Sequence, residues 1–196
     1  MNIVIINTNC SNLFSIKTML NRLGHKPIIS DNSDVILQSD KLLLPGVGTA
    51  AAAMQQLKKK KLVTLIQNCT KPILGICLGM QLFGTISEEN YGIETLKIIN
   101  TPIKRMQYHG FPLPHMGWNT ITIPQKNPLF DKIKKNNYFY FAHSYCIKIC
   151  DVTGAHTKYG QLFSSVIEYK NFFGVQFHPE KSGLSGQQLV KNFLEM

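Results

Sequence analysis

Apolar and polar residues alternate with two different periods along the first half of the chain. Residues 3–6 form a short apolar run with β-branched side chains, which predicts a strand buried on both faces. Residues 12–23 place leucine and isoleucine at helical spacing, and Gly24 follows as a residue that commonly closes a helix. The same reasoning predicts strands at residues 27–30, 41–44 and 72–76, and a helix that Thr49 caps and that extends to residue 66. Strands that alternate with helices are typical of a parallel α/β sheet.

The second half of the chain contains more strand signals and fewer helical ones. A final helix is expected to begin near Ser182 or Ser185. Strands are predicted at residues 118–123, 138–145, 151–156, 164–168 and 172–177, joined by turns that contain Gly, Asn or Pro. We therefore expect one α/β domain over residues 1–196, with a mixed, largely parallel central sheet flanked by helices and a smaller antiparallel addition.

Composition narrows the class of protein. The apolar fraction of 44% is enough for a core, and no apolar run reaches the roughly 20 residues of a membrane-spanning helix. The first residues lack the basic start of a signal peptide, and the five cysteines have no metal-ligand spacing, which fits reduced thiols. We expect a cytoplasmic protein without a membrane segment or metal. No Gly-rich nucleotide loop is visible, so we also expect no cofactor.

The formal net charge of +10 raises the question of a nucleic-acid partner. The lysines do not form a stripe with interleaved aromatic residues, however. The densest run, residues 58–61, is contiguous and is therefore expected to spread around a helix. A solvated basic surface without nucleic acid is the preferred interpretation. A polyanion-binding role, a phosphorylated substrate and an acidic protein partner stay open.

Residues 75–79, Gly-Ile-Cys-Leu-Gly, have the form of a nucleophile elbow with a cysteine where many hydrolases place serine. A tight strand-to-helix turn would hold Cys77 at the carboxyl end of the sheet. The helix that follows would present free N–H groups and the positive end of its dipole, which stabilise a thiolate. The Leu78 N–H would point toward the oxyanion that forms when Cys77 attacks a carbonyl. The alternative is a packed turn with an inert cysteine.

Residues 172–180 predict a strand that delivers His178 at its end. Residues two apart in an extended chain project to the same side, so Glu180 is expected to lie beside His178. A carboxylate in that place fixes the histidine tautomer and stabilises the imidazolium that forms when His178 accepts the thiol proton. A lone His-x-Glu is often surface chemistry, but with an elbow cysteine it indicates a Cys77–His178–Glu180 triad.

Three stretches together resemble the class I, triad-type glutamine amidotransferases: residues 45–48, 75–81 and 175–180. Within that family the chain is most similar to the glutaminase subunits of imidazole glycerol phosphate synthase. The segments that carry this closer similarity are residues 44–49, 114–119, 140–145 and 191–196. The resemblance runs from end to end. It implies that Cys77 is the nucleophile, His178 the base and Glu180 the orienting carboxylate.

The resemblance also implies roles for other residues. An oxyanion hole would be formed by Gly46, Val47, Gly48 and Leu78, although the glycines also suit a simple helix-entry turn. Gln81 would line the glutamine pocket, unless it is a solvated helix position. His143 and Ser144 would lie near the bound glutamine, or serve only as a polar pair at a strand end.

Partner contacts are implied for Asn12, Trp118 and Lys181. Trp118, the sole tryptophan, is either an interface residue or a core anchor, and Lys181 is alternatively part of a solvated turn. The first loop departs from the family pattern. Asn7 stands where an aspartate is usual, and Asn9 and Ser11 replace small residues. This departure concerns coupling to the partner more than the chemistry of the triad.

The implied activity is hydrolysis of glutamine to glutamate and ammonia through a Cys77 thioester. The ammonia would pass to a (β/α)8-barrel cyclase subunit in a heterodimer of histidine biosynthesis. One alternative is a glutaminase for anthranilate, pyridoxal phosphate or nucleotide synthesis, against which residues 114–119 argue. Two others are a stand-alone cysteine hydrolase or peptidase and a binding subunit that has lost activity.

Overall fold

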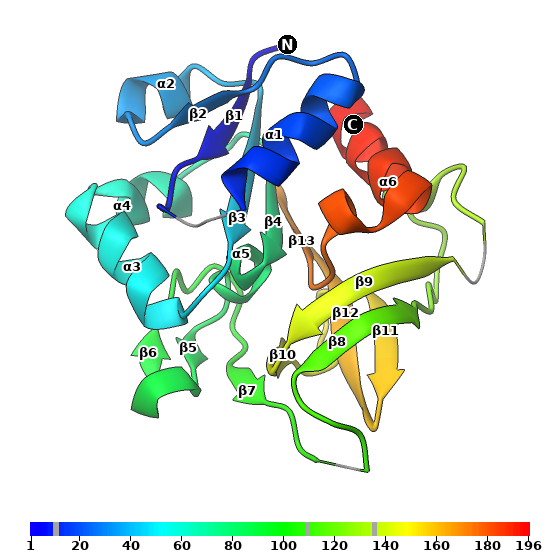
Figure 1. Ribbon diagram of the computed structural model, residues 1–196. Coiled ribbons are helices and arrows are strands. Elements are labelled where there is room, and N and C mark those ends of the chain that lie inside the picture. The colour runs from blue at the N-terminus through cyan, green and yellow to red at the C-terminus, as the bar shows by residue number, and fades with distance from the viewer. Residues whose placement is uncertain (10–11, 109, 135–136) are drawn as a thin grey trace.

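The computed structural model describes residues 1–9, 12–108, 110–134 and 137–196 (Figure 1). Cys10 and Ser11, which entered the predictions about cysteines and about the first loop, lie outside the described residues.

A mixed sheet forms the centre of the molecule. Among the described residues, seven strands pair in the order β11-β12-β13-β4-β3-β1-β2. From β13 to β2 every pair is parallel, whereas β11, β12 and β13 pair antiparallel. The expected largely parallel sheet with an antiparallel addition is confirmed. The strands are β1 (Ile3–Ile6), β2 (Ile28–Ser30), β3 (Lys41–Gly46), β4 (Ile73–Cys77), β11 (Thr153–Tyr159), β12 (Gln161–Tyr169) and β13 (Phe172–Val175).

Helices cover both faces of this sheet because its central strands are apolar on both sides (Figure 1). In β1, Ile3 and Ile5 pack with one set of helices, and Val4 and Ile6 pack with the other. The first set is α1 (Leu13–Arg22) and α6 (Gly183–Glu195). The second set is α2 (Ser33–Leu37), α3 (Ala50–Lys59) and α4 (Leu62–Gln67). The core is therefore two apolar layers, one on each side of the sheet.

Two smaller sheets complete the fold at the edge where the parallel strands end. One has the order β10-β7-β5-β6 and the other pairs β8 with β9 antiparallel. Their strands are β5 (Ile86–Ser87), β6 (Ile93–Glu94), β7 (Ile103–Arg105), β8 (His115–Thr120), β9 (Tyr138–His143) and β10 (Tyr145–Ile147). The short helix α5 (Leu78–Gln81) follows β4, and short 3-10 turns occupy η1 (Glu89–Tyr91), η2 (Pro128–Phe130) and η3 (Pro179–Lys181). None of the helices in the described ranges is long and apolar enough to cross a membrane.

Several predicted boundaries in the first half were wrong. The helix expected to run from Thr49 to residue 66 is two helices, because Lys61 adopts a left-handed conformation with φ 55° between α3 and α4. The lysine run 58–61 thus straddles this break instead of spreading around one helix. The strand expected to stop at Pro45 continues through Gly46, since Pro45 and Gly46 pair in parallel with Ile76 and Cys77.

In the second half each predicted strand overlaps an observed one, but the limits of the strands were wrong. The strand predicted at residues 118–123 is β8, which begins at His115 and ends at Thr120 because its pairing with β9 ends there. The strand predicted at residues 138–145 is interrupted at Ser144, where β9 ends and β10 joins another sheet.

Candidate active site

The sheet order places three loops at one edge of the molecule. Strands β13, β4 and β3 are adjacent and parallel, with Val175 opposite Ile76 and Cys77 opposite Gly46. Their carboxyl ends therefore lie side by side. The loop that carries His178 leaves on one side of Cys77, and the loop that carries Val47 and Gly48 leaves on the other.

Cys77 occupies a strained turn between β4 and α5. Its φ of 53° and ψ of −110° lie outside the regions that ordinary residues prefer, and Leu78 begins the helix directly after it. Small residues permit this turn. A Cβ added to Gly79 would lie 1.8 Å from the Leu44 carbonyl oxygen, and one added to Gly46 would lie 2.8 Å from the Gly79 nitrogen. Cys77 is 6% exposed, so the turn leaves little of this residue open to solvent.

His178 and Glu180 lie together beside Cys77. His178 Nδ1 is 2.8 Å from Glu180 Oε1, and both side chains are almost completely buried. Burial disfavours the imidazolium, but hydrogen bonds with the Cys77 and Glu180 side chains outweigh that effect and raise the pKa of His178. The contact was predicted from an extended chain, and that geometric reason was wrong. Strand β13 ends at Val175, and Glu180 lies in the 3-10 turn η3 that folds back toward His178.

Asn12 approaches the triad from the start of α1. Its Nδ2 donates a hydrogen bond to Glu180 Oε1, the same oxygen that contacts His178. The other carboxylate oxygen, Oε2, is buried and accepts no hydrogen bond from the described residues. Asn12 was predicted to contact a partner, and that stays a prediction. The structure adds a contact inside the chain that the sequence did not indicate.

A cavity of about 350 Å³ opens in front of Cys77. Three residues of the predicted oxyanion hole line this cavity. Val47 and Gly48 come from the loop after β3, and Leu78 comes from the elbow. Glu89 is the one carboxylate among the described lining residues. The lining is completed by Gln81, Pro114, Ala142, His143, Ser144, Tyr145, His178 and Lys181. Gln81, His143 and Ser144 are thus brought together with the triad. Gly46 lies behind them in β3, opposite Cys77.

Gln81 connects the elbow to the opposite wall. Its Nε2 donates to the Tyr145 carbonyl oxygen at 2.8 Å and to Gln176 Oε1 at 3.0 Å. Gln176 Nε2 in turn lies 3.7 Å from Cys77 Sγ. Gln81 is 7% exposed and Gln176 is fully buried, so neither is a solvated helix position. Gln176 was not among the residues predicted to form the site. A polar residue between Val175 and Phe177, in an otherwise apolar segment, was the available signal.

His143 and His115 form a buried pair behind the cavity. His143 Nδ1 is 2.9 Å from the Tyr145 carbonyl oxygen, and His143 Nε2 is 3.1 Å from His115 Nδ1. Because a carbonyl only accepts, His143 carries its proton on Nδ1 and receives a hydrogen bond from His115 at Nε2. Asn119 Nδ2 then donates to His115 Nε2 at 3.3 Å. Burial lowers the pKa of His143 to about 3 and that of His115 to about 4, so both rings are neutral.

The two remaining predicted partner residues both contact Tyr140. The Trp118 side chain is 55% exposed, which rules out a core anchor, and its ring meets the Tyr140 ring edge to face. Lys181 lines the cavity, and its ammonium lies 5.6 Å from the centre of the Tyr140 ring.

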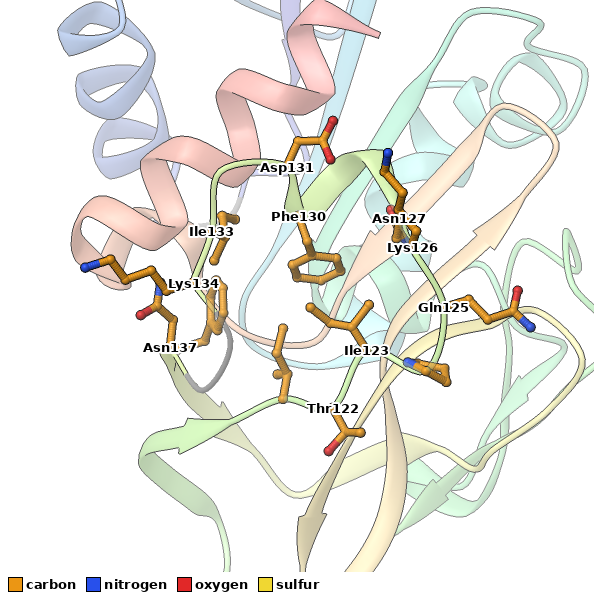
Figure 2. Close-up of a pocket in the computed structure, with 13 residues that line it drawn as sticks. Thr122, Ile123, Gln125, Lys126, Asn127, Phe130, Asp131, Ile133, Lys134 and Asn137 are labelled. Carbon is orange, nitrogen blue, oxygen red and sulfur yellow. The ribbon is translucent and has the colours of Figure 1, made fainter.

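A second cavity, of about 530 Å³, lies in the connection between β8 and β9 (Figure 2). Figure 2 shows the side chains of Ile123, Phe130 and Ile133 turned toward it, whereas Gln125 and Lys134 point outward. Its described lining contains no cysteine, histidine or serine. It therefore lacks the cysteine and histidine pairing that lies at Cys77. In the described ranges no cluster of His, Cys, Asp and Glu could hold a metal ion.

Known proteins with the same name match this chain over its whole length. Curated proteins named imidazole glycerol phosphate synthase subunit HisH include one from Blochmanniella pennsylvanica, 80% identical over 196 residues that cover 100% of both chains. Proteins of the same name from Pectobacterium atrosepticum and Salmonella typhimurium are 54% and 51% identical, again over 100% of both chains.

Solved structures share the fold at lower identity. A putative GMP synthase protein from Thermoplasma acidophilum superimposes with a TM-score of 0.77 at 18% identity, covering 100% of this chain and 93% of that chain. A glutamine amidotransferase from Thermotoga maritima gives a TM-score of 0.67 at 14% identity and covers 100% and 83%. The family profile described as Glutamine amidotransferase class-I matches residues 4–196. The chain therefore belongs to the class-I glutamine amidotransferase family.

Proposed function

We propose that this chain is the glutaminase subunit of an imidazole glycerol phosphate synthase. The observation that carries the proposal is the strained Cys77 elbow, which shares a cavity with His178, while Glu180 in η3 lies behind His178 at 2.8 Å. The names of relatives that are 51–80% identical over the full chain direct it to this synthase. In this proposal residues 1–196 act as one domain in the cytoplasm, without a cofactor.

The proposed chemistry begins with proton transfer from Cys77 to His178. The thiolate attacks the side-chain carboxamide of glutamine, and the oxyanion is held by N–H groups from residues 46–48 and from Leu78. Protonated His178 gives its proton to the departing ammonia, leaving a glutamyl thioester on Cys77. His178 then takes a proton from water, which hydrolyses the thioester to glutamate and regenerates the thiol. Glu180 holds the His178 ring and stabilises its charged form throughout.

The cavity suits glutamine as the substrate. An amino acid carries an ammonium and a carboxylate, and the described lining offers a carboxylate in Glu89 and an ammonium in Lys181. Gln81 uses both N–H groups of its amide on Tyr145 and Gln176, so its carbonyl oxygen remains available as an acceptor. His143 and Ser144 also line this cavity.

A partner is needed because ammonia that escapes into neutral water is protonated and loses its nucleophilicity. Exposed apolar side chains lie on elements that pack around η3 and around β9, next to the triad: Phe14 at 79%, Leu184 at 83%, Trp118 at 55% and Tyr138 at 59%. We assign this face, together with Asn12 and Lys181, to a heterodimer with a (β/α)8-barrel cyclase. That cyclase uses the ammonia to make imidazole glycerol phosphate and aminoimidazole carboxamide ribotide.

Glutamine hydrolysis by the purified chain tests this proposal. The chain is assayed alone, with a histidine-pathway cyclase and with the cyclase plus its nucleotide ligand, and Cys77→Ala is assayed under each condition. We expect low turnover alone, strong activation in the complex and none with Cys77→Ala. High activity that does not depend on the cyclase would indicate that the chain serves another pathway or is a stand-alone hydrolase. Activity retained by Cys77→Ala would remove Cys77 as the nucleophile.

A further inference from the structure

Gln176 is a buried amide in contact with the reacting sulfur. It follows the last residue of β13 and is two residues before His178, so the strand that brings the base also brings this side chain to Cys77. The side chain is fully buried, and an amide in such a place is costly unless its groups are hydrogen bonded. Nε2 lies 3.7 Å from Cys77 Sγ, and Oε1 lies 3.0 Å from Gln81 Nε2.

The orientation of the Gln176 amide follows from its neighbours. The Tyr145 carbonyl oxygen can only accept, so the group of Gln81 that faces it at 2.8 Å is the NH2. The second hydrogen of that NH2 points to Gln176, which must therefore turn its oxygen toward Gln81. The NH2 of Gln176 is left facing Cys77. His143, which donates to the same Tyr145 oxygen, and His115 behind it hold this end of the network in place.

We propose that Gln176 is a further residue of the catalytic site, which donates a hydrogen bond to the Cys77 thiolate, and that Gln81 is the positioning residue that aims it. A hydrogen bond to a charged acceptor is stronger than one to a neutral acceptor, so the donor favours the thiolate over the thiol. It acts when the thiolate attacks, and again when the thiolate leaves the thioester. The inference rests on the proposed function in one respect, that Cys77 is the nucleophile.

The test measures the alkylation of Cys77 by iodoacetamide as a function of pH, with Cys77 identified by its peptide mass. Gln176→Met keeps the length of the side chain and removes the donor, and it is expected to raise the pH midpoint of alkylation by about one unit. Gln176→Glu, which faces the sulfur with a carboxylate, is expected to raise the midpoint further. The same direction is expected for Gln81→Met, with a smaller effect because the Gln176 amide is freed rather than removed.

Asn192→Leu is the matched control. It removes another buried amide, which donates to the Leu129 and Asp131 carbonyl oxygens near the end of α6. Loss of this amide is expected to lower the melting temperature and to leave the alkylation midpoint unchanged. A midpoint in Gln176→Met and Gln176→Glu equal to that of the unmodified protein would overturn the proposal.

A measurement on the unmutated side chain removes any dependence on how well the variants fold. The Gln176 side-chain NH2 resonances of 15N-labelled protein are followed against pH. We expect them to shift with the midpoint of Cys77 alkylation, and to show no such transition in Cys77→Ala. Chemical shifts that stay constant while Cys77 ionises would contradict the hydrogen bond. If Cys77 of the unmodified protein does not react with iodoacetamide, the proposed function fails. If Cys77 reacts normally and the Gln176 variants leave the pH midpoint of alkylation unchanged, only the role of Gln176 fails.

Discussion

Glu180 receives two contacts on a single oxygen, and each contact can be tested separately. His178 Nδ1 and Asn12 Nδ2 both approach Oε1. A carboxylate at this point forces the proton of the neutral imidazole onto Nδ1 and leaves Nε2 free to act as the base. In the proposed mechanism, the orientation of this one carboxylate therefore decides whether His178 can take a proton from Cys77.

Glu180→Gln is expected to lower kcat for glutamine hydrolysis by a factor of about 10² to 10⁴, because an amide can present its NH2 to Nδ1 and favour the wrong tautomer. The assay uses the complex with the cyclase and its ligand. Glu195→Gln is the control, since Glu195 is exposed and forms only a surface ion pair with Lys191. A loss of less than threefold in Glu180→Gln would show that the carboxylate does not orient the histidine.

Asn12→Ala removes one donor to a charged carboxylate and is expected to slow the alkylation of Cys77 roughly tenfold in the isolated chain. The isolated chain matters because a residue that serves only a partner would have no effect there. Asn9→Ala is the control from the same loop, as its side chain bonds to Gln56 and Lys60 and not to the triad. Equal alkylation rates in both variants would restrict Asn12 to the interface.

At the scale of elements, the site depends on how closely α5 approaches β3. The Gly79 Cα lies so near the Leu44 carbonyl that any Cβ would collide with backbone atoms. Backbone cannot rotate aside as a flexible side chain can. The elbow therefore requires glycine at this position for packing, independently of the chemistry of Cys77.

Gly79→Ala is expected to abolish folding or to lower the melting temperature by more than about 10 °C, because the Cβ would lie 1.8 Å from the Leu44 oxygen. Gly24→Ala is the control. Gly24 has a positive φ of 84° but nothing within 4 Å of an added Cβ, so only backbone strain opposes the alanine. That variant is expected to lose a few degrees. Thermal unfolding followed by circular dichroism separates the two, and similar losses would contradict the packing argument.

The strands and helices with clear periodicity were predictable from the sequence, and three of the shortest strands were not. The four apolar residues of β1 and the helical spacing in α1 have local causes. Strands β5, β6 and β7 contain two or three residues each, which is too few for a period of two to be visible. The break at Lys61 is not marked by glycine or proline, and a lysine in the left-handed conformation gives no signal in the sequence.

The proximity of Cys77, His178 and Glu180 was predictable because each lies within a recognisable motif, whereas the network behind them was not. The contacts of Gln176 with Gln81 and Cys77 join positions that are 95 and 99 residues apart. Such pairs are defined by sheet order, which a single sequence does not display. His115 lay within a segment used for the resemblance, but only the pairing of β8 with β9 places it opposite His143.

At the scale of the whole molecule, the neutral pair His115 and His143 links stability to pH. Both pKa values are lowered by burial, to about 4 and about 3, whereas an unfolded histidine has a pKa near 6.5. The unfolded state therefore binds more protons than the folded state as the pH falls below about 6.5. The stability that the neutral rings provide is fully present above that pH and is lost toward pH 4 and pH 3. The raised pKa of His178 adds no slope below pH 6.5, because both states then hold its proton.

The free energy of unfolding is consequently expected to fall by about 1.4 kcal/mol per pH unit for each of the two histidines as the pH drops from 6 to 5. Urea unfolding at pH 7, 6 and 5 measures this slope. His115→Phe leaves one titrating ring and suits the stacked position between Phe141 and Tyr159, so its slope between pH 6 and 5 is expected to be about half as steep. The variant also deprives His143 Nε2 of its donor, which lowers stability at every pH without changing the slope. Parallel pH profiles for the two proteins would mean that His115 is protonated in the folded state, and that the hydrogen-bond chain from Asn119 to Tyr145 does not have the proton order assigned to it.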